Sequence, residues 1–383
     1  MKRGGIHYFV LFVSSVVLAQ ETIVEIGELP DAIRESSGLI YYNGRLITHN
    51  DSGNTPQLFE VDTLNLAITR TVNVANATNV DWEDIAQDDK YIYIGDFGNF
   101  RGDRQDLVIY RVAKSDYDVM DAVVADRIDF SYVEQTDFSG DDTGSDWDAE
   151  AMFVIGDQLI ILTKQWRSLG TVAYGVPKEI GTYEAIDLGT YHVNGLVTGA
   201  TYNALTNTLF LVGYSQTLFS FVTQFTNATL PSVFEGMVKR TNLNIGMAQV
   251  ESITHTAADT YFFSSERFLN DNPPIHTEAR LFTFKLVDDI PKEEEEEVVD
   301  TDQQSDQLVL YRNFGSQSLG YDLQTQERLF GRAIFDTTGS MIRFTHAKDI
   351  NRNEVDVSTM PAAVYYLTFF LQNGVLSKAF ILD

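Results

Sequence analysis

Acidic side chains recur in this chain beside short runs of strand-forming residues. The clearest case is Asp81-Trp82-Glu83-Asp84, which precedes the apolar run Tyr91–Ile94 and the corner Gly95-Asp96-Phe97-Gly98-Asn99. Five copies of this order occur, each with a polar residue that we call the anchor, a strand, a turn, a second strand and a corner. The residues that anchor the five copies are Ser37, Glu83, Glu150, Thr198 and Glu251. Crowded carboxylates repel one another, so they need a cation or raised pKa values.

Three interpretations of these carboxylates stay open. Oxygen ligands suit Ca²⁺, and the metal candidates are Glu83, Asp84, Asp96 and Glu150. A pair drawn from Asp51, Asp96 and Glu150 would suit glycoside hydrolysis, which uses one carboxyl as acid and another as base or nucleophile. The plainest interpretation is a solvated channel with turn-capping acids. Nucleophile-elbow and phosphate-loop motifs are missing from the sequence, so we favour a binding module over an enzyme.

The spacing of the anchors predicts the fold. Successive anchors are 46, 67, 48 and 53 residues apart, and further strand-like runs follow each anchor pair. Four strands in about 40–50 residues is typical of a β-propeller blade. The fifth copy lacks one strand, which Glu21–Glu28 can supply, so that the ring closes without free edges. We therefore predict five blades within residues 20–289, or six if the 67-residue interval hides another hairpin.

Propeller geometry predicts where the anchors and corners lie. The first strand of each blade lines the central channel, and the chain returns to the same end after the second strand. Anchors and corners should therefore form two rings near one mouth of the channel, where a glycan or peptide would bind. The candidate ligand-binding residues are Glu35, Asp51, Asp81, Glu83, Asp84, Asp96, Asp148, Glu150, Lys164, Tyr214, Glu251 and Glu266.

Composition excludes several classes of protein. The net charge of −28 repels nucleic acid, and the absence of cysteine excludes disulfides and thiolate chemistry. The basic start Met1-Lys2-Arg3, the apolar run Tyr8–Ala19 and the small-residue end Val17-Leu18-Ala19 predict a signal peptide over residues 1–19. No later segment reaches the roughly 20 apolar residues of a membrane helix. We expect an exported protein without a transmembrane segment.

The composition changes near Asp288. Glu293–Glu297 lies within an acidic stretch, residues 290–306, that cannot bury a core and is typical of a linker. Residues 307–383 then contain about seven short strand-like runs, which predict a small immunoglobulin-like β-sandwich. Since few contacts should cross such a linker, we expect this domain to add nothing to the stability of the propeller.

Three segments of the C-terminal region resemble the sorting domain of cargo of the type IX secretion system of Bacteroidetes. They are Ile334-Phe335-Asp336-Thr337-Thr338-Gly339-Ser340-Met341, the stretch from Val355 to Leu367, and Ser377-Lys378-Ala379-Phe380-Ile381-Leu382. The resemblance implies passage through the outer membrane by that machinery, with release or surface attachment. Glu35-Ser36-Ser37-Gly38-Leu39 and His49-Asn50-Asp51-Ser52-Gly53, with the acidic motifs above, resemble secreted bacterial propellers that carry such domains. That second resemblance implies fold and location only.

Overall fold

The computed structural model describes residues 23–271, 274–286, 307–312, 318–325, 327–336, 341–350, 352–371 and 374–382. The expected signal peptide and acidic linker lie outside these residues. The regular structure of the described chain is almost entirely β-strand, with one short helix, α1 (Lys114–Tyr117), and two 3₁₀ turns, η1 (Asp31–Ile33) and η2 (Ala347–Asp349). No helix in the described part is long and apolar enough to cross a membrane.

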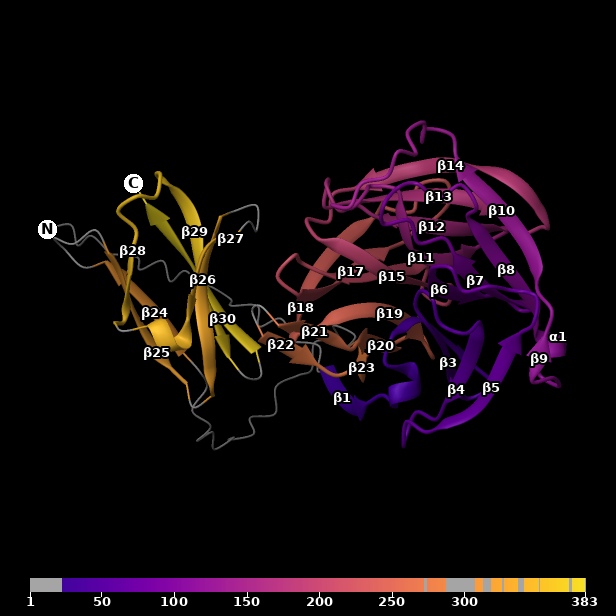
Figure 1. Cartoon of the computed structure of the whole chain (residues 1–383), viewed down its shortest axis with the longest axis horizontal. Helices are drawn as coiled ribbons and strands as arrows, with labels where there is room; N and C mark the ends of the chain where they lie inside the picture. The colour runs from indigo at the N-terminus through magenta and orange to yellow at the C-terminus, as the bar shows by residue number, and fades with distance from the viewer. Residues whose placement is uncertain are drawn as a thin grey trace, which may run out of the picture.

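The strands before residue 287 form consecutive antiparallel meanders arranged around an axis (Figure 1). The first contains β2 (Ser36–Tyr42), β3 (Arg45–Asn50), β4 (Gln57–Val61) and β5 (Ile68–Val74). The second contains β6 (Trp82–Gln87), β7 (Tyr91–Asp96), β8 (Val108–Ala113) and β10 (Asp126–Tyr132). The third contains β11 (Asp148–Ile155), β12 (Gln158–Lys164), β13 (Thr171–Pro177) and β14 (Gly181–Tyr191). The fourth contains β15 (Leu196–Asn203), β16 (Thr208–Tyr214), β17 (Phe219–Thr226) and β18 (Met237–Met247).

The last meander is completed by the start of the chain. It contains β19 (Gln249–His255), β20 (Thr260–Glu266) and β23 (Arg280–Lys285), and β1 (Ile23–Glu28) pairs antiparallel with β23. This pairing confirms the predicted role of the Glu21–Glu28 segment, of which Ile23–Glu28 is described. A small hairpin, β21 (Phe268–Asp271) with β22 (Pro274–Thr277), precedes β23.

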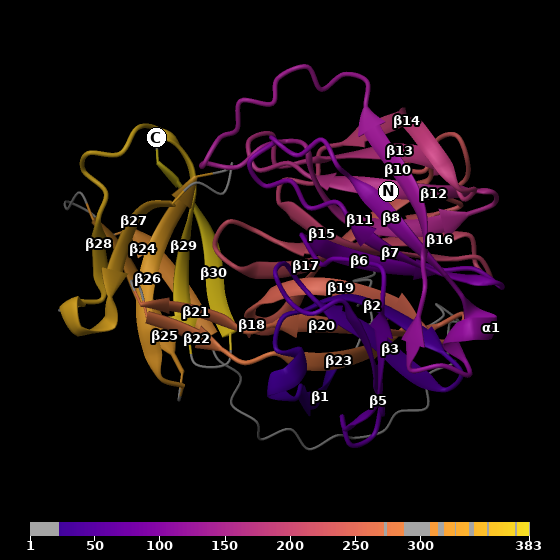
Figure 2. The ribbon, with the colours of Figure 1, turned by 45° about the vertical axis from the view of Figure 1, so that its right-hand side comes forward.

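The first strands of the meanders contact one another in a closed cycle. β2 lies against β6, β6 against β11, β11 against β15, β15 against β19, and β19 against β2. Side chains of neighbouring meanders form the core between them, as in the cluster that joins Ile47 and Leu58 to Trp82 and Ile94. The arrangement is propeller-like, with the first strands around the axis and the later strands outward (Figures 1 and 2).

Two strands within the 67-residue interval between Glu83 and Glu150 pair with the edge strands of neighbouring meanders. It contains β9 (Ala122–Val123), which pairs in parallel with β5, and β10, which pairs in parallel with β14. The second pairing joins two meanders into one sheet of eight strands. An unpaired edge strand invites association with other chains, so both pairings protect the outer edges of the first three meanders.

The region after residue 306 forms two further sheets. β24 (Gln307–Arg312), β25 (Ser318–Gln324) and β28 (Glu354–Asp356) make one. β27 (Met341–His346), β26 (Leu329–Asp336), β29 (Ala363–Leu371) and β30 (Gly374–Leu382) make the other. The seven strands match the predicted runs, because their residues alternate or cluster in the apolar pattern of strands. We call residues 307–382 the C-terminal sheets and residues 23–286 the ring.

Candidate acidic site

Every anchor residue is the extra residue of a β-bulge. The register between the first two strands of each meander shifts across Glu83, Glu150, Thr198 and Glu251, and across Ser37 together with Gly38. A bulge leaves one residue outside the ladder and re-aims its side chain. The repeat in the sequence therefore corresponds to a repeated backbone irregularity, and the three glutamates are buried at its equivalent positions.

The two hydroxyl anchors join neighbouring meanders. Ser37 Oγ donates to the carbonyl oxygen of Glu83 over 2.6 Å, and Thr198 Oγ1 donates to the carbonyl oxygen of Val250. These bonds satisfy carbonyls that a bulge would otherwise leave unpaired inside the protein. Ser37 and Thr198 thus support the ring, and the chemistry of the site is left to the acidic anchors.

Three carboxylates lie close together beside the second strand of the first meander and the first strand of the second. Asp51 follows β3, Asp81 precedes β6 and Glu83 lies in the β6 bulge; one oxygen from each lies within 4.8 Å of the others. Glu83 is buried, whereas Asp51 and Asp81 are half-buried. We call these three residues the carboxylate triad. It is the group among the described residues that offers the geometry of a metal site.

Burial and mutual repulsion raise the pKa values of the triad. Burial, with the charges of Asp51 and Asp148, raises the pKa of Asp81 to about 7. Burial and the neighbouring Glu150 raise the pKa of Glu83 well above its usual value. The pKa of Asp51 is also raised, chiefly by burial. Proximity of like charges without a cation favours the protonated form of each acid.

Gly98 lies directly against two members of the triad. A Cβ atom at this position would stand 2.2 Å from Glu83 Oε1 and 2.4 Å from Asp81 Oδ2. Arg104 holds this corner in place, because its Nη1 donates to the Gly98 carbonyl over 2.9 Å and its Nη2 pairs with Asp96 Oδ1 over 3.0 Å. Sequence reasoning missed both Gly98 and Arg104. The glycines in Gly95-Asp96-Phe97-Gly98 were the available signal, whereas nothing local marks Arg104.

Lys164 is the other cation of the site, and Glu150 engages it. Lys164 Nζ lies 3.0 Å from Glu150 Oε1, and both side chains are 7% exposed. The ammonium group also lies 4.7 Å from the centre of the Trp166 ring and 5.5 Å from that of Tyr214. Burial disfavours the charge on Lys164, but Glu150 and the other neighbouring acids outweigh it and raise its pKa. Lys164 is thus paired with Glu150, and its charge opposes only in part the rise in the pKa of Asp51 that burial causes.

Glu251 and Glu266 extend the acidic surface toward the last meander. Burial raises the pKa of Glu251 to about 7, despite the opposing charge of Lys164. Burial and Glu251 raise the pKa of Glu266 well above its usual value. Tyr214 lies near the Lys164 ammonium group and Glu251, and its hydroxyl accepts a hydrogen bond of 2.9 Å from Gln249 Nε2. Glu35, at the rim, accepts one of 2.7 Å from Asn54 Nδ2.

Three other predicted ligand residues, Asp84, Asp148 and Asp96, accept hydrogen bonds from backbone N–H groups. Asp84 accepts hydrogen bonds from the N–H groups of Ile85 and Met152, over 2.8 and 2.7 Å. Asp148 Oδ1 accepts from the Asn99 N–H over 2.6 Å, and Asp148 Oδ2 accepts from Trp166 Nε1 over 2.8 Å.

Asp96 completes this supporting set. It accepts hydrogen bonds from the Asp81 N–H over 3.0 Å and the Val80 N–H over 3.4 Å, besides its ion pair with Arg104. Of the predicted metal ligands Glu83, Asp84, Asp96 and Glu150, only Glu83 belongs to the carboxylate triad. Among the predicted catalytic candidates, Asp96 and Glu150 each have a cationic partner, whereas Asp51 is in the triad.

The aromatic residues near the site differ in role. Trp82 is fully buried between meanders, where its Nε1 donates to the Thr78 carbonyl over 2.9 Å. Trp147 is half-buried and packs against Tyr132. Trp166 is half-buried beside Lys164 and meets Phe100 edge to face. Trp166 is thus the tryptophan that belongs to the site itself.

Comparisons with known proteins return distant structural likenesses only. No protein-family model matches the chain, and no curated protein matches it. A mitotic checkpoint complex structure aligns over 99% of both chains, with 9% identity and a TM-score of 0.32. A quinonprotein alcohol dehydrogenase-like protein from Bacteroides thetaiotaomicron aligns over 83% of this chain and 67% of its own, with 8% identity and a TM-score of 0.30. A GH43 beta-xylosidase/alpha-arabinofuranosidase from a compost microbial metagenome aligns over 63% of this chain and 93% of its own, with 10% identity and a TM-score of 0.36.

Proposed function

We propose that the ring is a five-bladed β-propeller that acts as a binding module, and that its carboxylate triad takes a Ca²⁺ ion that helps hold a glycan or peptide ligand. The observation that carries this proposal is the convergence of Asp51, Asp81 and Glu83, with one carboxylate oxygen from each within 4.8 Å of the others. Calcium accepts such carboxylate oxygens in flexible geometry.

The charge balance of the site favours a cation ligand. Among the described residues, Lys164 pairs with Glu150, Arg104 with Asp96 and Arg34 with Glu35. Neither Lys164 nor Arg104 forms an ion pair with a member of the triad, and the pKa values of Asp81 and Glu83 are raised. A divalent cation would relieve this repulsion and return the acids to their charged forms.

The strand arrangement supports the blade count. Each meander begins with an inner strand that carries a bulge, and the inner strands contact in one cycle through β2, β6, β11, β15 and β19. The two C-terminal sheets support an immunoglobulin-like sandwich, since they share one apolar core around Leu319, Leu367 and Phe369.

Glycoside hydrolysis is the second candidate. Asp81, with a pKa of about 7, lies beside Asp51 in the same group of carboxylates, and glycoside hydrolases use two neighbouring carboxyl groups in acid and base or nucleophile roles. We rank it second because Asp96 and Glu150, two of its three expected catalysts, are held by Arg104 and Lys164.

The location of the protein is proposed from the sequence. A signal peptide over residues 1–19, the acidic linker over 290–306 and the resemblance of the C-terminal region to type IX sorting domains support export to the cell surface or medium. Deleting residues 307–383 in a host with that secretion system should then retain the protein in the periplasm, as fractionation and immunoblotting would show.

Calcium titration of the chain without residues 1–19 tests the binding proposal. Thermal unfolding with Ca²⁺ at a hundredfold excess over its dissociation constant should show about 2.7 kcal/mol of added stability. Glu83→Gln and Asp51→Asn should remove the response. Glu184→Gln is the matched control, because Glu184 is exposed on β14, and it should leave the response unchanged.

Two outcomes would contradict the binding proposal. If calcium does not change the unfolding of the natural protein, and the acids titrate at ordinary pH, the triad is a solvated channel lining. Release of reducing sugar from a glycan panel, lost in Asp81→Asn, would instead favour the hydrolase.

A further inference from the structure

The four-stranded C-terminal sheet is apolar on both faces. One face packs Ile334, Leu367 and Phe369 into the core of the C-terminal sheets. The opposite face carries a second cluster that includes Phe335 and Phe370, which are only 6% and 7% exposed. An antiparallel sheet with one face in water alternates apolar and polar residues. This second face is therefore built to be covered.

The ring covers part of this face. Among the described residues, those that join the second cluster from outside the C-terminal sheets are Phe219 and Met247. They are cross-strand partners on β17 and β18, so their side chains lie on one face of that meander. The Phe219 ring stacks on Phe370 with centroids 5.9 Å apart and an angle of 18° between the planes.

A glycine shapes the aromatic surface that Phe219 meets. Gly331 on β26 lies opposite Phe370 on β29, and a Cβ at this position would stand 2.5 Å from the Phe344 ring. The missing side chain lets Phe344 and Phe370 approach to 5.6 Å between centroids. The two rings therefore form one platform across the strand.

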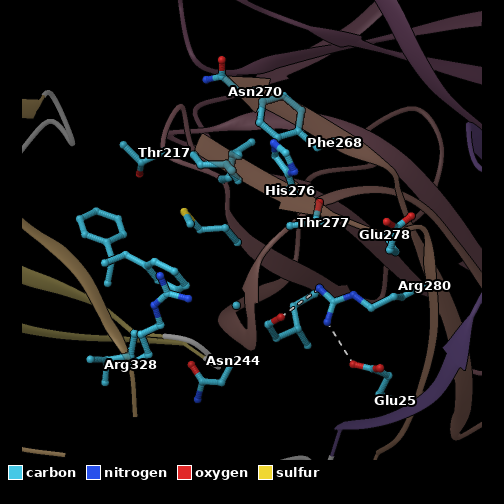
Figure 3. Close-up of a pocket in the computed structure, with 18 of the residues that line it drawn as sticks. Glu25, Thr217, Asn244, Phe268, Asn270, His276, Thr277, Glu278, Arg280 and Arg328 are labelled. Atoms are coloured by element: carbon cyan, nitrogen blue, oxygen red, sulfur yellow. Dashed lines mark hydrogen bonds and ion pairs between the residues drawn. The ribbon is translucent and has the colours of Figure 1, made fainter. Parts of the chain in front are cut away.

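Part of the boundary between the ring and the C-terminal sheets is hollow. A cavity of about 1360 Å³ lies beside the aromatic contact, and its walls come from both parts of the chain. Figure 3 shows the Arg280–Glu25 ion pair of 3.0 Å in the ring wall, with Arg328 of the C-terminal sheets on the other side. Figures 1 and 2 both place the C-terminal sheets beside β18 and the β21–β22 hairpin. The two parts are thus in contact at the aromatic cluster and where β18 meets β30, beside this cavity.

We propose that the surface around Phe219 and Met247 is a docking site for the chain's own C-terminal sheets, and that the contact can be released. The occupant is identified by one apolar cluster that is continuous across both parts, in which Phe335, Phe344 and Phe370 pack with Phe219 and Met247. Because a cavity of about 1360 Å³ lies beside the aromatic contact, we expect the association to be weaker than that of a standard interface. This inference is independent of the calcium site.

The test cuts the chain while keeping both parts. A specific protease site is placed between residues 290 and 306 of the chain without residues 1–19, and the cleaved protein is followed by sedimentation velocity over a dilution series. The two fragments should sediment together at high concentration and separate on dilution. Phe370→Ala and Phe219→Ala should each weaken the association about tenfold or more, since buried aromatic contacts dominate small interfaces.

Two further variants separate docking from misfolding. The double variant Phe219→Ala/Phe370→Ala should lose little more than either single variant, because both remove the same contact. Tyr366→Ala is the matched control, since Tyr366 lies on β29 but is 41% exposed, and it should associate like the natural protein. Fragments that separate at every concentration would overturn the proposal, as would a Phe370→Ala protein that associates normally. Assemblies of two rings and two C-terminal fragments would instead identify a second copy as the occupant.

Discussion

Replacing Lys164 by Met should destabilise the ring strongly. The variant keeps the apolar stem and removes the ammonium group that lies 3.0 Å from Glu150, in a pair whose side chains are 7% exposed. Breaking a buried ion pair by removing one partner costs about 3–5 kcal/mol, because the remaining charge is uncompensated. In a domain of this size each kcal/mol lowers the melting temperature by about 2–4 °C.

Urea unfolding at pH 7 measures this loss. The double variant Lys164→Met/Glu150→Gln should recover most of it, because neither charge remains to be solvated. Arg127→Met is the control: Arg127 pairs with Asp129 at 2.6 Å, but both side chains are more than a third exposed, so its loss should stay below about 1 kcal/mol. A Lys164→Met loss as small as that of Arg127→Met, or a double variant no more stable than the single one, would refute the reasoning.

Two further predictions concern the triad and ring closure. Without calcium, the natural protein should lose stability relative to Asp81→Asn as pH rises from about 4 to about 7, because folded Asp81 has a pKa of about 7 against its usual 3.8 and therefore holds a proton that the unfolded chain releases. Urea unfolding of both proteins across that interval checks the sign, and a relative gain with rising pH would contradict it. Deleting residues 21–29 should remove several kcal/mol, because β1 completes the sheet of β23, β20 and β19; an unchanged melting temperature would show that closure contributes nothing.

Much of the local structure follows from the sequence because strands depend on short-range patterns. Alternation and turn residues predicted most strands of the ring and all seven of the C-terminal sheets, in most cases to within three residues of their ends. The exceptions are β18, which was expected over 233–239 and spans Met237–Met247, and the β21–β22 hairpin, which was not expected. The repeat of the anchors was also visible, since each copy needs the same residue types around the same bend. Its cause, a bulge at each of Glu83, Glu150, Thr198 and Glu251, was not visible, because a bulge is defined by the partner strand.

The site required the tertiary structure because each carboxylate has several candidate partners. Asp84 accepts a hydrogen bond from the Met152 N–H of the next meander, 68 residues away, and Lys164 forms an ion pair with Glu150. Residue types alone do not distinguish Asp84 and Glu150 from Asp51 and Asp81, which belong to the carboxylate triad. Few contacts were expected between the ring and the C-terminal region, because an acidic linker joins them. The linker sequence does not reveal the apolar outer face of β26 and β29, which contacts Phe219. Residue types set the charge and periodicity of this protein, whereas the pairing of its charges and aromatic faces was decided by contacts between segments distant in the chain.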